Sequence, residues 1–230
     1  MTPSKTYRIN LGPGMKGFDV EALQVNLKKL DQVTLFVNGI YDATTTAEVK
    51  QFQSRNNLLV DGYAGPRTQR KMASIWMSKA RNAVSLPSGL LAGFCELESG
   101  FAVGAANFRQ AGFVDLGWMQ FHLPFPSDQN TYHSAIDGSI CFPKAANILR
   151  TRKNQFYKGL NHVNDQRDWE LAALAHSWPA GAKALYNGTG LSDQPAAWVQ
   201  AIGAINVESP LDWANFYIAH VTKYVTKWSA

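Results

Sequence analysis

The sequence predicts a mainly α-helical protein in which a small helical domain precedes a larger helical domain with a short β element. Three observations predict this fold class: an internal repeat in the first third of the chain, helical apolar spacing in most of the remainder, and a short strand pattern around residues 112–121. Apolar residues three or four positions apart form the buried face of a helix, whereas strands alternate at every second position. The predicted segments are a first domain at residues 7–76, a helical linker at residues 77–87 and a second domain at residues 88–230.

The first domain is predicted from two similar turns that lie 23 residues apart, an Asn-Gly pair at 38–39 and an Asp-Gly pair at 61–62. Such pairs favour turns, and a threonine can cap the helix that follows. We therefore expect Thr45 and Thr68 to cap two helices. A first helix, capped by Asp19, is predicted from apolar residues at helical spacing, namely Val20, Leu23, Leu27 and Leu30.

The larger domain is predicted to begin after the punctuation Pro87-Ser88-Gly89, because the residue before a proline disfavours helix. Gly- and Pro-rich loops separate its helical patterns. Helices are expected at residues 90–98, 144–157, 169–176, 196–205 and 211–228.

Composition and charge exclude several classes of protein. Of the 230 residues, 46% are hydrophobic and 12% aromatic, which supports a buried core and excludes a chain that is mainly disordered. The longest apolar run near the middle, residues 90–95, is far shorter than the ~20 residues of a membrane span. The net charge is +5, and the first 76 residues supply +4 of it, from 10 Lys and Arg less 6 Asp and Glu. The basic first domain therefore predicts an anionic partner.

Other sequence features address location and cofactors. No apolar run follows the charges of the first eight residues, so we expect no secretory signal. Cys95 and Cys141 are too few for a disulfide framework, which favours synthesis in a reducing cytosol. The histidines and cysteines lack metal-site spacing, and neither a phosphate-binding glycine loop nor a nucleic-acid recognition pattern is present. We expect a monomer with no cofactor, no metal and no nucleic-acid partner.

The residues that best fit a catalytic role lie at the end of the predicted helix 90–98. This apolar helix delivers the carboxylate of Glu98 beside a buried surface, where the pKa of Glu98 should rise. A raised pKa suits a general acid of the kind that glycosidases use. The alternative is a solvated glutamate at a helix terminus. Glu96 cannot share the face of Glu98, because positions two apart lie on opposite sides of a helix.

The first domain resembles the peptidoglycan-binding module of bacterial and phage wall-lytic enzymes, from about Tyr7 to Trp76. The resemblance rests on both turns, on glycines in the family order, and on the Leu-Gln and Phe-Gln pairs at 23–24 and 52–53. It implies peptidoglycan as the partner, and the anionic wall agrees with the basic charge of this region. Residues 32–36 depart from the family pattern.

The second domain resembles soluble lytic transglycosylases and goose-type lysozymes over about residues 88–217. The family motif Glu-Ser-x-Phe matches residues 98–101, and Gly-Leu-Met-Gln matches residues 117–120 with a tryptophan in place of leucine. A third motif, Ala-Tyr-Asn-x-Gly, is divergent at residues 175–181, where His176 replaces the tyrosine. The resemblance implies a lysozyme-like α+β fold for this domain.

This resemblance implies Glu98 as the catalytic residue. Asp115, which lies close to the second motif, is either a second carboxylate that activates water or an aspartate that caps a loop. Trp118 either stacks on a sugar or fills the core. His176 is either a partner of Glu98 or a core histidine. The residues implied to bind substrate or to position Glu98 are Ser99, Trp118, Met119, Gln120 and His176.

A wall-binding module followed by a lysozyme-like domain resembles the modular endolysins of phages that infect Gram-negative bacteria. The resemblance implies cleavage of the β-1,4 bond between N-acetylmuramic acid and N-acetylglucosamine for host lysis, by a lytic transglycosylase with one catalytic glutamate. The alternatives are a hydrolysing muramidase assisted by Asp115, or a non-catalytic wall-binding or phage structural protein. The expected location is the host cytoplasm, followed by action on the periplasmic wall with a separate membrane-permeabilising protein.

Overall fold

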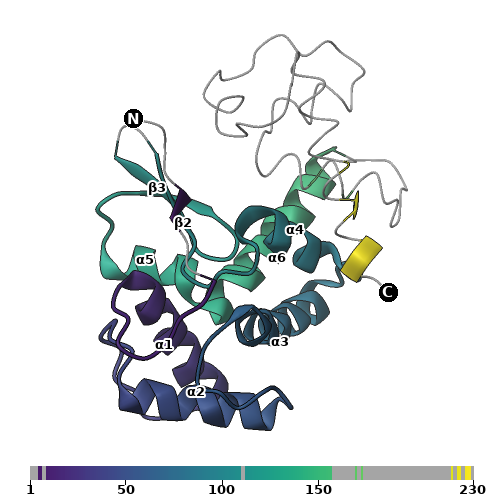
Figure 1. The fold of residues 1–230 in the computed structure, drawn as a ribbon. Coiled ribbons are helices and arrows are strands. Elements are labelled where there is room, and N and C mark those ends of the chain that lie inside the picture. The colour runs from purple at the N-terminus through teal and green to yellow at the C-terminus, as the bar shows by residue number, and fades with distance from the viewer. Residues whose placement is uncertain are drawn as a thin grey trace. The chain divides into compact units, whose positions relative to one another are not determined.

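The computed structural model describes residues 5–6, 9–109, 112–156 and, near the C-terminus, 169, 172, 219, 222–223 and 226–228. The described part is mainly helical with one short antiparallel sheet (Figure 1), which confirms the predicted fold class. The helices are α1 (Phe18–Asp31), α2 (Ala43–Arg55), α3 (Pro66–Val84), α4 (Leu90–Ser99), α5 (Gln129–Ile136) and α6 (Gly138–Phe156). The strands are β1 (Lys5–Thr6), β2 (Ala106–Arg109), β3 (Phe113–Leu116) and β4 (Phe121–Pro124).

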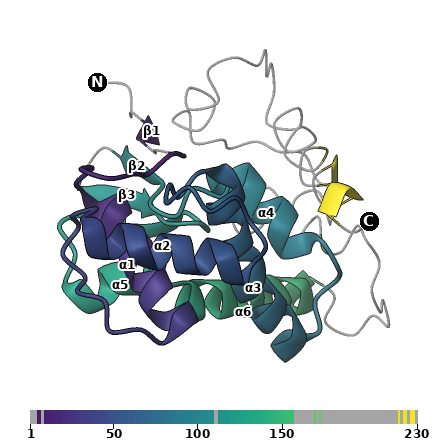
Figure 2. The same cartoon turned by 60° about the horizontal axis from the view of Figure 1, so that its bottom comes forward.

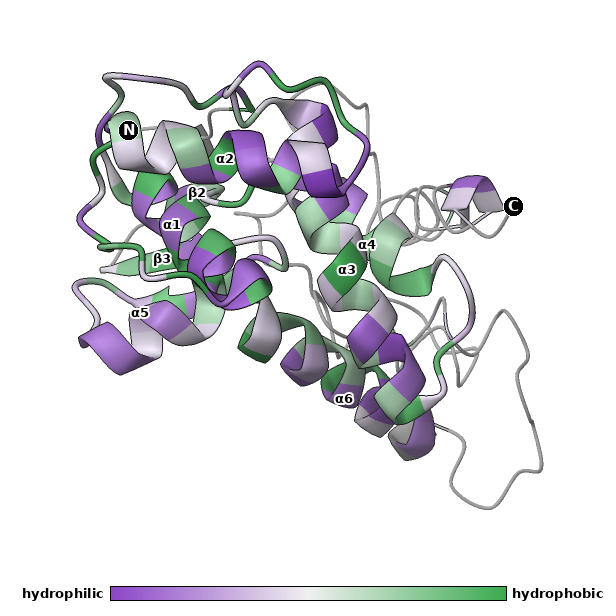
Figure 3. Cartoon of the chain, turned by 90° about the horizontal axis from the view of Figure 1, so that it is seen from below, coloured by the Kyte–Doolittle hydropathy of each residue, from purple (hydrophilic) through white to green (hydrophobic). Residues whose placement is uncertain are grey.

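Helices α1, α2 and α3 correspond to the three helices predicted for the first domain (Figure 2). Each helix carries both apolar and polar residues along its length, as Figure 3 shows, because one face is buried and the other meets solvent. Residue Gly17 is the N-cap of α1 and makes no side-chain capping bond. The prediction that Asp19 caps this helix is therefore wrong, because the helix has already begun at Phe18.

The predicted threonine caps are also wrong. Asp42 is the N-cap of α2, and its carboxylate accepts a hydrogen bond from the backbone N–H of Thr45 at 2.7 Å. An ionised carboxylate at this position satisfies a helix N–H and also interacts favourably with the positive end of the helix dipole. Thr45 and Thr68 lie inside the first turns of α2 and α3, where their hydroxyls accept hydrogen bonds from glutamine side chains.

The β element is larger than the single strand predicted around residues 112–121. Strands β1 to β4 form an antiparallel sheet in sequence order. The register pairs Asn107 with Asp115 and Asp115 with His122, so these three residues form one row across β2, β3 and β4. The predicted strand divides into β3 and the start of β4, because residues 117–120 form the turn between them.

The structure divides into two compact units that do not follow the order of the sequence. The described residues of one unit lie within Pro3–Ala80 and Glu98–Pro143, and those of the other lie within Arg81–Leu97 and from Lys144 onward. The first unit therefore joins the helices of the predicted binding domain to the sheet and to α5. The predicted boundaries at residues 76 and 88 stay a prediction.

A buried asparagine connects the two parts of the first unit. Asn26 of α1 is fully buried, and its Nδ2 donates to the backbone oxygen of Ile136 at 2.8 Å. Its Oδ1 accepts from the backbone N–H of Gly138 at 2.9 Å. One side chain thus satisfies the last carbonyl of α5 and the first N–H of α6, groups that a helix leaves unpaired. The core of this unit includes Leu11, Leu23, Phe52, Phe101, Trp118 and Phe142.

Within the described residues, none of the helices is long and apolar enough to cross a membrane. The predicted helices 169–176, 196–205 and 211–228 fall largely outside these residues, as does His176.

Candidate active site and wall-binding turns

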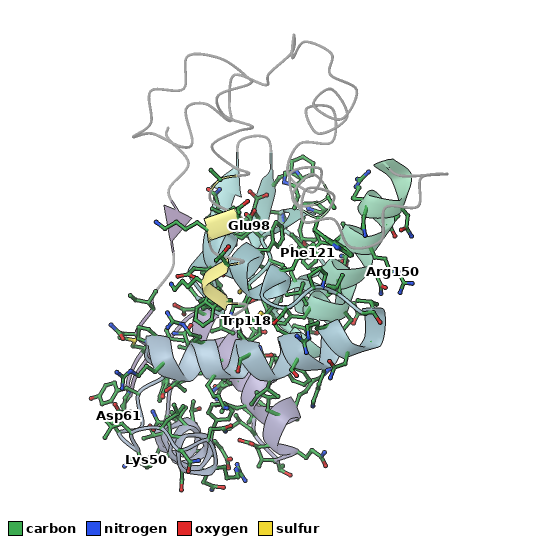
Figure 4. All side chains as sticks on the ribbon, turned by 90° about the vertical axis from the view of Figure 1, so that its right-hand side faces the viewer. Lys50, Asp61, Glu98, Trp118, Phe121 and Arg150 are labelled. Atoms are coloured by element: carbon green, nitrogen blue, oxygen red, sulfur yellow. The ribbon has the colours of Figure 1, made fainter. Side chains whose placement is uncertain are left out.

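The candidate catalytic glutamate lies at the C-terminal end of α4. The helix buries Leu90, Leu91 and Phe94, as its apolar sequence predicts. Glu98 is half-buried in the last turn (Figure 4), and the helix ends one residue later, at Ser99. The chain then leaves the helix through Gly100, whose φ of 59° is the left-handed conformation that glycine adopts without strain.

The first motif, residues 98–101, is hydrogen-bonded to the second motif, residues 117–120. The indole Nε1 of Trp118 donates to the backbone oxygen of Phe101 at 3.0 Å, and both side chains are buried. The backbone oxygen of Ala105 accepts from Gly117 N at 2.8 Å and from Gln120 Nε2 at 3.1 Å. The tertiary structure thus brings together two motifs that the sequence separates.

The second motif requires glycine at its first position for a steric reason. Gly117 has a φ of 77°, and a Cβ atom added to it would lie only 2.2 Å from the backbone oxygen of Ala135. The β3–β4 turn therefore packs against the end of α5 so closely that no side chain fits at this position. This contact fixes the turn that carries Gln120.

Gln120 combines a fixed backbone with a partly open side chain. Its φ is 47°, and its Nε2 donates to the backbone oxygens of Ala105 and Gly117, at 3.1 and 2.9 Å. The side chain is half-buried. In the part of the chain that the structure describes, its Oε1 receives no hydrogen bond. An amide oxygen has two acceptor sites, so Gln120 can accept from a ligand N–H or O–H.

Trp118 and Met119 are both fully buried. The Trp118 ring lies 5.3 Å from the ring of Phe142, and its N–H is already bonded to the backbone. Of the two alternatives for Trp118, the structure favours filling the core. Met119 is likewise fully buried, and Ser99 is 2% exposed. None of these three side chains is exposed at the surface of the described structure.

Asp115 lies in strand β3, next to the turn of residues 117–120. It is buried, at 6% exposure, and its Oδ1 lies 2.8 Å from Nδ1 of the cross-strand residue His122. An ionised carboxylate only accepts hydrogen bonds, so His122 donates from Nδ1 to it. The His122 ring stacks on Phe113 with centroids 4.7 Å apart. Its side chain is 59% exposed, which leaves a held histidine available beside the second motif.

His122 is a functional candidate that sequence reasoning missed. The signal that could have found it is the turn at residues 117–120. A turn of four residues between two antiparallel strands places Asp115 opposite His122. Because the sequence predicted only one strand here, this pairing was not visible.

The two turns of the binding region are held by buried glutamines. Gln24 Oε1 accepts from the backbone N–H groups of Asn38 and Gly39, each at 2.9 Å. Its Nε2 donates to Asn38 Oδ1, Ile40 O and Thr45 Oγ1, at 3.1, 2.9 and 2.9 Å. One side chain thus closes the whole turn and joins it to the helix that follows.

Gln53 repeats this arrangement at the second turn. Its Oε1 accepts from the backbone N–H groups of Asp61 and Gly62, and its Nε2 donates to Asp61 Oδ1, Tyr63 O and Thr68 Oγ1, over distances of 2.8 to 3.1 Å. The hydrogen bonds from the Tyr63 N–H and from Gln53 hold the pKa of Asp61 below its ordinary value. The repeat in the sequence therefore corresponds to a repeated hydrogen-bond network.

The two turns also contact each other. The hydroxyl of Tyr41 donates to the backbone oxygen of Gly62 at 2.7 Å, and burial raises the pKa of this tyrosine. Gly62 has a φ of 79°, and a Cβ on it would lie 2.9 Å from Lys50 Cε (Lys50 and Asp61 are labelled in Figure 4). The hydrogen bond from Tyr41 therefore links the two turns directly.

A comparison with protein families identifies the region that carries the two glutamine-held turns. Residues 16–72 match the family described as a putative peptidoglycan binding domain. This match confirms the predicted module. The comparison with curated protein sequences gives no match.

Comparison with solved structures finds further likenesses. The crystal structure of Burkholderia AP3 phage endolysin is 15% identical to this chain, over 96% of this chain and 98% of that one, with a TM-score of 0.28. A TM-score this low does not establish a shared fold.

Among the described residues, histidines, cysteines and acidic residues form no group of three or more that could hold a metal ion. The groups of this site that can carry acid–base chemistry or hold a ligand are Glu98 and the polar side chains around the second motif, Gln120, Asp115 and His122.

Proposed function

We propose that this protein is a phage endolysin that cleaves the glycan strands of peptidoglycan as a lytic transglycosylase, with Glu98 as its acid and base. The observation that carries the proposal is the hydrogen-bonded junction between residues 98–105 and residues 117–120. This junction lies in the same compact unit as the helices that match a putative peptidoglycan binding domain.

The reaction uses one carboxyl group twice. Glu98 donates its proton to the glycosidic oxygen while the bond from that oxygen to C1 of the muramic acid breaks. The O6 hydroxyl of the same sugar then attacks C1, and its proton passes to Glu98, which restores the acid. The N-acetyl group assists, which is a known exception to catalysis by two carboxylates. The products are a 1,6-anhydro end and a free sugar hydroxyl.

Gln120 is proposed to hold the substrate. Its Nε2 is fixed by two backbone oxygens, whereas its Oε1 receives no hydrogen bond from the described residues. The Oε1 can therefore accept from an acetamido N–H of the glycan. A side chain that the protein has already oriented loses little rotational freedom on binding, which favours affinity.

The second candidate is a hydrolysing muramidase. The observation that favours it is the buried carboxylate of Asp115, bonded to His122 at 2.8 Å beside the second motif. Such a pair can activate a water molecule, which would replace the O6 hydroxyl as the attacking group. The product would then be a reducing end.

Endolysin activity also implies a place of action. The protein would be made in the cytoplasm of the infected bacterium and would reach the periplasmic wall after a separate protein has permeabilised the membrane. The expected partner at the wall is peptidoglycan, with the module of residues 16–72 as the binding part. The protein is proposed to act as a monomer.

The test is mass spectrometry of the products that the protein releases from purified peptidoglycan, with Glu98→Gln as the matched variant. We expect 1,6-anhydro ends from the wild type and a loss of activity of at least ~1,000-fold in the variant, because the step then lacks its acid. Pull-down on peptidoglycan should be unchanged by this substitution. Reducing ends would identify a muramidase, and Asp115→Asn should then also abolish activity.

Two outcomes would overturn the proposal. Full activity of Glu98→Gln would exclude Glu98 as the acid. Binding without any product from the wild type would instead identify a non-catalytic wall-binding or phage structural protein.

A further inference from the structure

Helix α4 carries two glutamates in its last turns, and the structure separates their roles. Glu96 and Glu98 are two positions apart, so their side chains leave the helix on different sides. Both oxygens of Glu96 are bonded within the described residues. Lys227 Nζ donates to Oε1 at 2.7 Å, and Trp228 Nε1 donates to Oε2 at 2.5 Å. Glu96 is therefore a structural anchor and not a second candidate acid.

The contacts of Glu96 with Lys227 and Trp228 are partly buried and fix the orientation of its carboxylate. The Glu96 side chain is only 16% exposed, so both hydrogen bonds are formed in a partly desolvated place where a charged group needs its partners. Lys227 Nζ also lies 5.1 Å from the centre of the Trp228 ring, a cation–π contact. Two donors on different oxygens fix the rotation of the carboxylate as well as its position.

The place of this contact along α4 gives it a consequence for Glu98. The last turn of a helix has carbonyl groups without helical partners and frays easily. Immediately after this turn the chain passes through two residues of positive φ, Gly100 at 59° and Phe101 at 67°. A link from residues 227–228 to Glu96 stabilises the turn that carries Glu98, and it also neutralises the negative charge nearest to Glu98 along the helix.

We propose that Glu96, Lys227 and Trp228 are positioning residues that hold Glu98 in its catalytic orientation, an inference that rests on the proposed function. They act through the turn of α4 that Glu96 anchors. A small displacement of a catalytic group lowers the rate of the chemical step strongly, whereas it changes substrate binding much less. Loss of this anchor should therefore lower kcat and leave KM nearly unchanged.

The test uses the full chain and the variants Glu96→Gln, Lys227→Met and Trp228→Phe, assayed on soluble peptidoglycan fragments well below the unfolding temperature. Each variant should lower kcat by about tenfold with KM within about twofold of the wild type. Lys227→Arg, which keeps the charge and a donor, should recover most of the rate. Arg81→Met, which also removes one positive charge, is the charge-matched control and Thr226→Ala the control beside Lys227, because both residues are exposed and lie outside residues 16–72.

A second measurement does not depend on activity. Hydrogen exchange of a peptide that spans α4 should accelerate in Lys227→Met and stay at the wild-type rate in Arg81→Met. Unchanged exchange in Lys227→Met would overturn the anchor, whether or not the wild type cleaves peptidoglycan. Unchanged kcat in all three variants of an active enzyme would overturn the positioning role. If Glu98→Gln kept full activity, the proposed function would fail instead.

Discussion

Glutamines organise turns in two regions of this protein, but they do so in different ways. In the binding region, Gln24 and Gln53 are 0% and 1% exposed, and each uses both ends of its amide in five hydrogen bonds. In the second motif, Gln120 is half-buried, and among the described residues it forms two hydrogen bonds, both from its nitrogen. A saturated amide is part of the fold, whereas an amide held at one end can still bind a ligand.

The comparison also separates two uses of glycine. Gly39 and Gly62 adopt positive φ in turns that a glutamine closes. Gly117 adopts positive φ and in addition lies against the backbone of α5. All three glycines are closely packed, but a Cβ on Gly117 would lie 2.2 Å from a backbone oxygen, against 3.1 Å at Gly39 and 2.9 Å from a flexible lysine side chain at Gly62, so packing restricts the second motif most strongly. The predictions that follow test this difference, from the largest effect on stability to the smallest.

Substitution Gln53→Leu should have the largest effect. It removes the acceptor for the N–H groups of Asp61 and Gly62 and leaves buried polar atoms without partners, so we expect a loss of about 4 kcal/mol in the free energy of unfolding. Chemical denaturation measures this loss. The control is Gln51→Leu, an exposed glutamine of the same helix, which should change stability by less than about 0.5 kcal/mol. Equal effects of the two variants would break the comparison.

Substitution Gly117→Ala should lower the free energy of unfolding by about 3 kcal/mol. The methyl group would clash with the Ala135 carbonyl, and the positive φ would add strain. The matched control is Gly14→Ala. Gly14 has a φ of 83°, but a Cβ added to it would meet nothing within 4 Å beyond its chain neighbours, so strain alone should cost about 1 kcal/mol there. Thermal unfolding of both variants separates packing from strain. If the two variants lost equal stability, close packing at Gly117 would not contribute to the stability of the fold.

Substitution Gln120→Ala should affect function more than stability. We expect a change within about 1 kcal/mol in unfolding free energy, since only two hydrogen bonds of a half-buried group are lost. If Oε1 binds the acetamido group, KM for peptidoglycan fragments should rise about fivefold, the equivalent of one net hydrogen bond of about 1 kcal/mol. The exposed residue Gln129 supplies the control Gln129→Ala. A larger loss of stability than in Gln53→Leu would contradict the assignment of Gln53 to the fold and of Gln120 to ligand binding.

The smallest effect is a dependence of stability on pH at the second binding turn. Hydrogen bonds from the Tyr63 N–H and from Gln53 lower the pKa of Asp61 in the folded state. A carboxyl group with a depressed folded pKa stabilises the fold above its unfolded pKa of about 4 and loses this contribution as the pH falls through the folded value. Asp61→Asn should therefore be less stable than the wild type at pH 7, and this difference should shrink below about pH 4. Denaturation at neutral pH and again below the folded pKa measures it, and a difference that grows toward low pH would contradict the sign.

How much of this could be predicted from the sequence depends on the range of the interactions. The binding region was predictable because its repeat places each turn, each glutamine and each helix at a short distance along the chain. The errors there were local: an aspartate three residues before Thr45 competed for the cap and won, because a carboxylate is the stronger acceptor. At the candidate site, Glu98 and the glycine that ends its helix were both evident from the local pattern.

The remaining features required contacts between distant segments. Nothing in the local sequence shows that Trp118 would donate to Phe101 and lie in the core, that Asp115 would face His122 across the sheet, or that residues 227–228 would hold Glu96. The sequence by itself determined where helices and turns form and which chemistry is present, because those depend on neighbours along the chain. Tertiary structure alone decided which polar groups of the described residues have partners, because burial and partners are set by segments far apart in the sequence.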